Sequence, residues 1–146
     1  MSVNHPEENV VSGLYENYFE TQKEILTIEI RKTRNKLIYV ATTIFVFDFL
    51  AVMIANAFIL QTFLWISVVP LIILALAFFA LKEPMAAVIV ASLLIVGIWV
   101  YSIIITGGLA AISGWIGKAI IIYLLIAGFQ SAREAAKIKG ELKAAS

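Results

Sequence analysis

Apolar residues fill the middle of the chain almost without interruption, and polar residues gather at its two ends. Four apolar stretches follow one another, at residues 37–60, 63–81, 85–106 and 109–130. A helix of about 20 apolar residues crosses the ~30 Å hydrocarbon core of a bilayer. The pattern therefore predicts an all-α integral membrane protein in which four transmembrane helices form a bundle.

Short turn signals separate the predicted spans. We expect a tight turn between the first two spans at Gln61 and Thr62, and a second turn at the Gly107–Gly108 pair. A charged turn, Lys82–Glu83–Pro84, separates the second and third spans. Its Pro84 is well placed to begin the third helix, because proline suits the first helical position. Pro70 lies inside the second span and predicts a kink there.

The fourth span can begin at either of two places. If the helix starts at Leu109, the span has a normal length and Lys118 lies near the middle of the bilayer. If residues 109–117 form an irregular or re-entrant loop, the helix begins near Lys118, whose long side chain can then reach the outer surface. The first possibility is the preferred interpretation.

Residues 13–36 carry apolar side chains at helical spacing, which predicts an amphipathic helix between a polar tail at residues 1–12 and the first span. Two adjacent rows make up its apolar face: Leu14, Tyr18, Thr21, Ile25 and Ile28 in one, and Tyr15, Phe19, Gln22, Leu26 and Ile30 in the other. Such a helix lies on the inner membrane face or docks on a partner. The alternative is a plain cytosolic extension of the first span. The expected docking residues are Leu14, Tyr18, Phe19, Ile25 and Leu26.

Basic residues near the spans predict how the chain is oriented. A collar of four cations directly precedes the first span, and we expect it to contact lipid headgroups; it consists of Arg31, Lys32, Arg34 and Lys36. The turn at Lys82 and the helical tail at residues 132–146 are also basic. Cytoplasmic loops of membrane proteins are enriched in lysine and arginine. Both termini should therefore be cytoplasmic, and the bacterial inner membrane is the expected location.

Composition excludes several classes of function. The chain is 62% hydrophobic and only 14% charged, whereas a soluble domain carries about 25% charged residues. The formal net charge of +1 gives no electrostatic support for a nucleic-acid partner. There is no cysteine and His5 is the single histidine, so we expect no cofactor, no metal site and no catalytic constellation of known type.

Asp48 is the residue with the most specific chemical implication. It lies about 16 Å along a helix from Leu37, near mid-bilayer, where a charge costs about 2.5 to 3.5 kcal/mol on insertion scales. Asn56 lies on the same helical side, and Lys118 is the natural partner to satisfy both charges. Without that partner, a protonated Asp48 would hydrogen-bond a group such as Tyr123. The site is either a structural polar lock between helices or an ion site.

Three functions are compatible with this sequence. The preferred one is a non-catalytic multi-pass membrane subunit that packs on, stabilises or helps assemble a larger membrane complex. A small homo-oligomeric transporter or channel, coupled to protons through Asp48, is the alternative. A pore-forming, holin-like protein is the third. All three predict contact with lipid and association with protein partners or with further copies of the chain.

Overall fold

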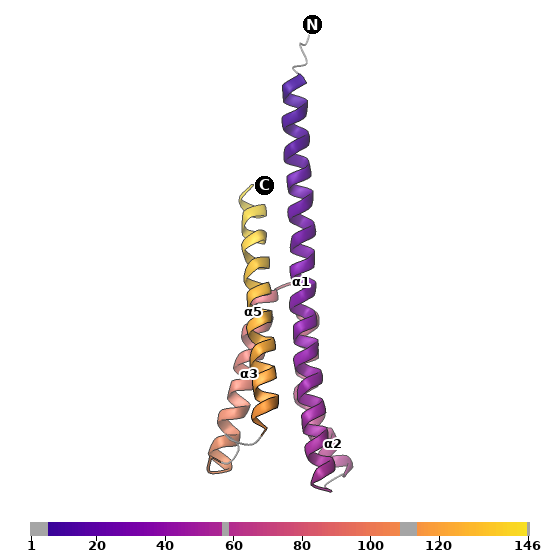
Figure 1. Cartoon of the computed structure of the whole chain (residues 1–146), viewed down its shortest axis with the longest axis vertical. Coiled ribbons are helices and arrows are strands. Elements are labelled where there is room, and N and C mark those ends of the chain that lie inside the picture. The colour runs from indigo at the N-terminus through magenta and orange to yellow at the C-terminus, as the bar shows by residue number, and fades with distance from the viewer. Residues whose placement is uncertain (1–5, 57–58, 109–113, 146) are drawn as a thin grey trace.

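The described part of the chain, residues 6–56, 59–108 and 114–145 of a computed structural model, consists of four helices without a strand. The helices are α1 (Pro6–Ile54), α2 (Leu60–Phe79), α3 (Pro84–Ile105) and α5 (Trp115–Ala144). They run alternately down and up, so that the start of α1 and the end of α5 point to the same side of the bundle (Figure 1). Each contains a stretch long and apolar enough to cross a membrane. The predicted all-α class and the four apolar helices are confirmed.

Helix α1 is a single rod that joins the predicted amphipathic segment to the first span. It has 49 residues, which corresponds to roughly 73 Å, and no glycine or proline occurs in it after Gly13. Its first half and the end of α5 stand clear of α2 and α3 (Figure 1). We call residues 10–36 of α1, together with residues 131–144 of α5, the stalk. Because α1 is unbroken at Lys36, the stalk part of α1 continues the direction of the apolar part of the helix.

The turn after α1 differs from the predicted one. Helix α1 ends at Ile54 and α2 begins at Leu60, so Gln61 and Thr62 lie in the first turn of α2. Asn56 has a φ of 50°, the left-handed conformation that asparagine tolerates better than most residues and that commonly ends helices. Asn56 therefore lies in the turn, and the prediction that placed it inside the first span is corrected.

The remaining turns follow the local sequence signals. Pro84 occupies the beginning of α3 as expected, and Gly107 and Gly108 have φ values of 62° and 95° in the turn after α3. Helix α5 begins at Trp115, just after Gly114, whose φ is 64°. This start lies between the two expected ones, and the earlier possibility, Leu109, lies outside the described residues. The polar tail continues α5 to Ala144, as predicted.

All four helices meet in a core near the base of the stalk. Alanine dominates this core, and its members are Leu37, Ala77, Ala80, Ala87, Val88, Ala91 and Ala132. Small residues let helix backbones approach closely, which membrane helices need because lipid removes the hydrophobic drive for association. A second cluster lies further from the stalk and consists of Val40, Ala41, Ile73, Ile95 and Ile121.

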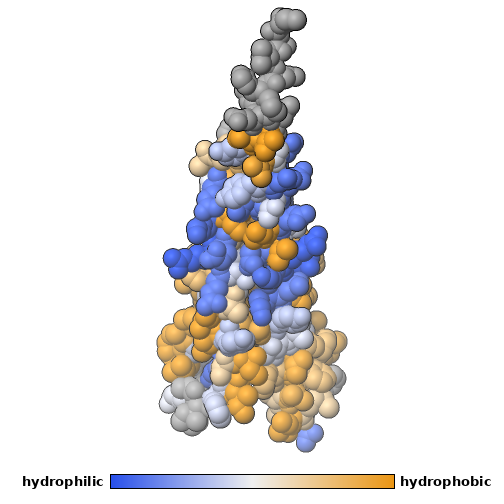
Figure 2. Space-filling model, turned by 45° about the horizontal axis from the view of Figure 1, so that its top comes forward, coloured by the Kyte–Doolittle hydropathy of each residue, from blue (hydrophilic) through white to orange (hydrophobic). Residues whose placement is uncertain are grey.

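Large apolar side chains cover most of the surface away from the stalk (Figure 2). Only 17% of the most apolar window in α2, and 17% of that in α3, is buried inside the chain. Soluble proteins rarely expose continuous apolar area of this extent. The stalk, in contrast, mixes hydrophilic residues with separate apolar patches (Figure 2).

Candidate functional site

Helices α1 and α5 are held together at two glycines. A β-carbon at Gly117 would lie 3.1 Å from Cγ of Phe47, and one at Gly128 would lie 3.4 Å from Cβ of Lys36. Phe47 lies eleven residues after Lys36, and Gly128 lies eleven residues after Gly117. Eleven residues are close to three helical turns, so both contacts lie along one antiparallel seam in the same register.

This register places Asp48 and Lys118 at nearly one level along the two helices. Asp48 follows Phe47 by one residue, and Lys118 follows Gly117 by one residue. When one residue of each of two antiparallel right-handed helices faces the other helix, the next residue along each chain points to the same side of the seam. The two steps run in opposite directions along the axis, which separates the residues by about 3 Å in height.

The shared flank continues the rows of α1 and α5 that are buried nearer the stalk. On α1, Asp48 lies seven residues after the buried Ala41 and eleven after the buried Leu37; on α5, Lys118 lies three residues before the buried Ile121. Both charges thus extend the core stripes of their helices, away from the stalk. There the Asp48 side chain is exposed and Lys118 is half-buried.

The expected bond between these charges is not formed in this conformation. The ion pairs found within the described residues join Lys32 with Glu29 and Lys139 with Glu83, and Asp48 takes part in neither. The polar lock therefore stays a prediction.

Asn56 and Tyr123 are not brought to this place. Asn56 lies in the turn after α1, and its side chain is exposed. Tyr123 follows Lys118 by five residues, which corresponds to about 140° around α5, and its side chain is 67% exposed. Neither residue faces Asp48.

In the stalk, only one of the two apolar rows of α1 is covered by other residues of the same chain. Phe19, Gln22, Leu26 and Ile30 are half-buried, and the next residue along this row, Thr33, is fully buried. In the register set by the Gly128–Lys36 contact, the buried Ala132, Ala135 and Ile138 of α5 lie level with residues 26–32 of α1. The other row stays exposed along its length. Of the expected docking residues, Leu14, Tyr18 and Ile25 are therefore free on the surface, whereas Phe19 and Leu26 already contact this chain.

The basic collar surrounds α1 where the stalk meets the core. Lys32 Nζ lies 2.6 Å from Glu29 Oε1, and Arg34 donates two hydrogen bonds to the side-chain oxygen of Asn35. Lys36 is half-buried beside Gly128. Nearby, Lys139 Nζ lies 2.7 Å from Glu83 Oε1, which places the turn between α2 and α3 beside the tail of α5, where the stalk meets the apolar bundle.

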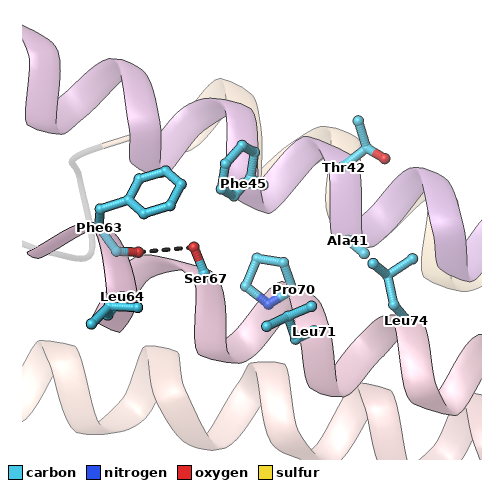
Figure 3. Close-up of a pocket in the computed structure, with 9 residues that line it drawn as sticks. All are labelled: Ala41, Thr42, Phe45, Phe63, Leu64, Ser67, Pro70, Leu71 and Leu74. Atoms are coloured by element: carbon cyan, nitrogen blue, oxygen red, sulfur yellow. Dashed lines mark hydrogen bonds between the residues drawn. The ribbon is translucent and has the colours of Figure 1, made fainter. Parts of the chain in front are cut away.

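An apolar groove lies between α1 and α2. Apart from Pro70, nothing in the sequence pattern indicated it. Phe45 and Phe63 close one end with their rings edge to face, 6.1 Å apart, and Ala41 and Leu74 lie at the other (Figure 3). Two hydroxyl groups also line it. Ser67 donates to the Phe63 carbonyl at 2.8 Å and Thr42 to the Ile38 carbonyl at 2.9 Å, so neither proton is offered to a ligand. The groove suits a hydrocarbon chain.

No group of three potential metal-ligating side chains lies together within the described residues. The arrangement therefore offers two features with a definite chemical character: the exposed row of the stalk, and the charges Asp48 and Lys118 on one flank of the seam. Comparison of the chain with protein-family models, with curated proteins and with solved structures gave no match.

Proposed function

We propose that this protein is a non-catalytic multi-pass membrane subunit that packs on, stabilises or helps assemble a larger membrane complex. The observation that carries the proposal is the exposed row of the stalk, in which Leu14 is 65%, Tyr18 55% and Ile25 38% exposed. Burial of such a row removes apolar surface from water, which is favourable by about 25 cal/mol for each Å² of apolar surface buried. We expect a helix of a partner protein to bind this row, because helix recognition commonly uses apolar side chains at helical spacing.

The proposal includes an orientation. The collar and the Lys82 turn lie where the stalk meets the apolar bundle, and the Lys139–Glu83 contact joins that turn to the tail of α5. Positive residues favour the cytoplasmic side. The stalk then projects into the cytoplasm, and the bacterial inner membrane is the proposed location.

Purification in mild detergent, followed by mass spectrometric identification of accompanying chains, tests the proposal. The double variant Leu14→Glu/Ile25→Glu places charges in the exposed row and should lose the partner. Thr27→Glu adds the same charge about 160° around the helix from Ile25, at a site that is also exposed, and should retain it. Recovery of the wild-type chain without any other protein would contradict the proposal.

The flank occupied by Asp48 and Lys118 favours a second candidate, a small homo-oligomeric transporter or channel coupled to protons through Asp48. Ionisable residues inside membrane bundles commonly mark ion pathways, and both groups extend the core stripes of α1 and α5 at one level. Flux into proteoliposomes tests this candidate. Equal flux for the wild type and Asp48→Asn would remove it.

A further inference from the structure

The exposed row of the stalk has the spacing of a coiled-coil seam. It begins at Val11 and continues in alternating steps of three and four residues through Leu14, Tyr18, Thr21, Ile25 and Ile28. All six side chains are exposed. A seven-residue repeat of this kind keeps one seam facing a partner helix over many turns.

The same face continues beyond the stalk. The next positions of the repeat are Lys32, Asn35, Tyr39, Thr42 and Val46, and each is exposed. Tyr39, Thr42 and Val46 line a groove that α5 completes with Ile120 and Leu124. One continuous face of α1 therefore runs from the stalk into the apolar half, and α5 does not cover it.

We propose that this face binds α1 of a second copy of the chain, in a parallel two-stranded coiled coil. The inference rests on the exposed row that also carries the proposed function, and it names the first partner of that row. Two copies inserted in one membrane in the same direction have parallel α1 helices, and their identical collars hold equivalent residues at one height. A twofold interface of this kind sets each residue of the seam against its own copy, which suits the apolar positions of the repeat.

The polar part of the repeat suits this partner. Lys32 occupies a seam position between the stalk and the apolar half, and its ammonium is neutralised by Glu29 of the same chain at 2.6 Å. A polar residue at a single seam position fixes register and the number of strands, at a cost in stability. Lys32 and Asn35 therefore favour the parallel, in-register dimer over shifted pairings.

Cysteine cross-linking of the full chain in native membranes tests the proposal, and the chain has no cysteine of its own. Single Leu14→Cys and Ile25→Cys variants should form disulfide-linked dimers under mild oxidation, because a disulfide requires Cα atoms less than about 7 Å apart. Glu20→Cys and Thr27→Cys are the matched controls, since both sites are exposed on the other side of the helix. Equal cross-linking at all four sites, or none at the two seam sites, would overturn the proposal.

The outcome is separable from that of the proposed function. Seam-specific dimers, with no other chain recovered in mild detergent, would support the dimer and contradict the larger complex. A co-purifying chain that the Leu14→Glu/Ile25→Glu variant loses, with no cross-link at either seam site, would support the larger complex and contradict the dimer.

Discussion

The ring of Phe47 on α1 lies directly against Gly117 on α5, where a β-carbon would approach three ring carbons to 3.1–3.3 Å. We expect Gly117→Ala to lower the free energy of unfolding, because overpacking of a tight contact costs about 1–3 kcal/mol. The gain in helix propensity from glycine to alanine, about 1 kcal/mol, offsets part of this cost. Gly117→Leu should lower the free energy of unfolding further. Thermal unfolding in detergent, followed by circular dichroism, measures both.

Two other glycines of α5 provide controls for this prediction. A β-carbon at Gly128 meets its nearest neighbour at 3.4 Å, and one at Gly140 meets nothing within 4 Å. Gly128→Ala should be close to neutral, and Gly140→Ala should stabilise the protein by roughly 0.5–1 kcal/mol through propensity alone. An increase in stability for Gly117→Ala equal to that for Gly140→Ala would refute the close seam.

We expect Asp48 and Lys118 to be coupled energetically, since they lie on one flank of the seam at nearly one height. Asp48→Asn should be less favourable to stability in the wild type than in the Lys118→Gln variant, because only the wild type keeps an opposite charge at nearly the same height. A coupling of about 1 kcal/mol is expected, in the range measured for polar pairs inside membranes. A double-mutant cycle of unfolding free energies measures it, and additive losses would show that the two groups act independently.

The Glu83–Lys139 contact should contribute little to stability. Its two side chains are 57% and 51% exposed, and exposed ion pairs contribute about 0–1 kcal/mol. Glu83→Gln should therefore shift the unfolding midpoint only slightly, and the shift should vanish in 1 M salt, where the Debye length is about 3 Å. A large loss of stability that does not depend on salt would contradict this expectation. It would mean that the pair anchors the turn to α5 despite its exposure.

Ala132 should tolerate no larger side chain. It is fully buried in the alanine-rich core, so Ala132→Leu should cost about 1–3 kcal/mol by overpacking. Ala136→Leu adds the same atoms to an exposed position one turn later on α5 and should leave stability nearly unchanged. Unfolding in detergent compares the two variants, and an equal response would place Ala132 outside the core.

Local signals in the sequence accounted for much of the helical layout. Pro84 begins α3, and Gly107 and Gly108 turn the chain after it, because these residues restrict or extend backbone conformation on their own. The end of α1 was less predictable. Asn56 read as a polar residue inside an apolar run, and its role in the turn follows from a left-handed conformation that the hydrophobic pattern does not record.

The candidate site depended more on packing between distant segments. Both rows of the stalk have helical spacing, so periodicity alone could not say which row faces α5 and which remains exposed. Likewise, the depth of Lys118 relative to Asp48 was open while the start of α5 was uncertain. The contacts of Gly117 with Phe47 and of Gly128 with Lys36 set the register of the two helices, and with it the level of both charges.

The sequence by itself determined that four apolar segments would be helices long enough to span a membrane, because hydrophobicity and hydrogen bonding within a helix are local properties of the chain. Only the tertiary structure decided that one face of α1 packs on α5 while the other stays open, and that Asp48 and Lys118 share a flank. Those relationships depend on how closely two helices approach, which small residues far apart in the chain control together.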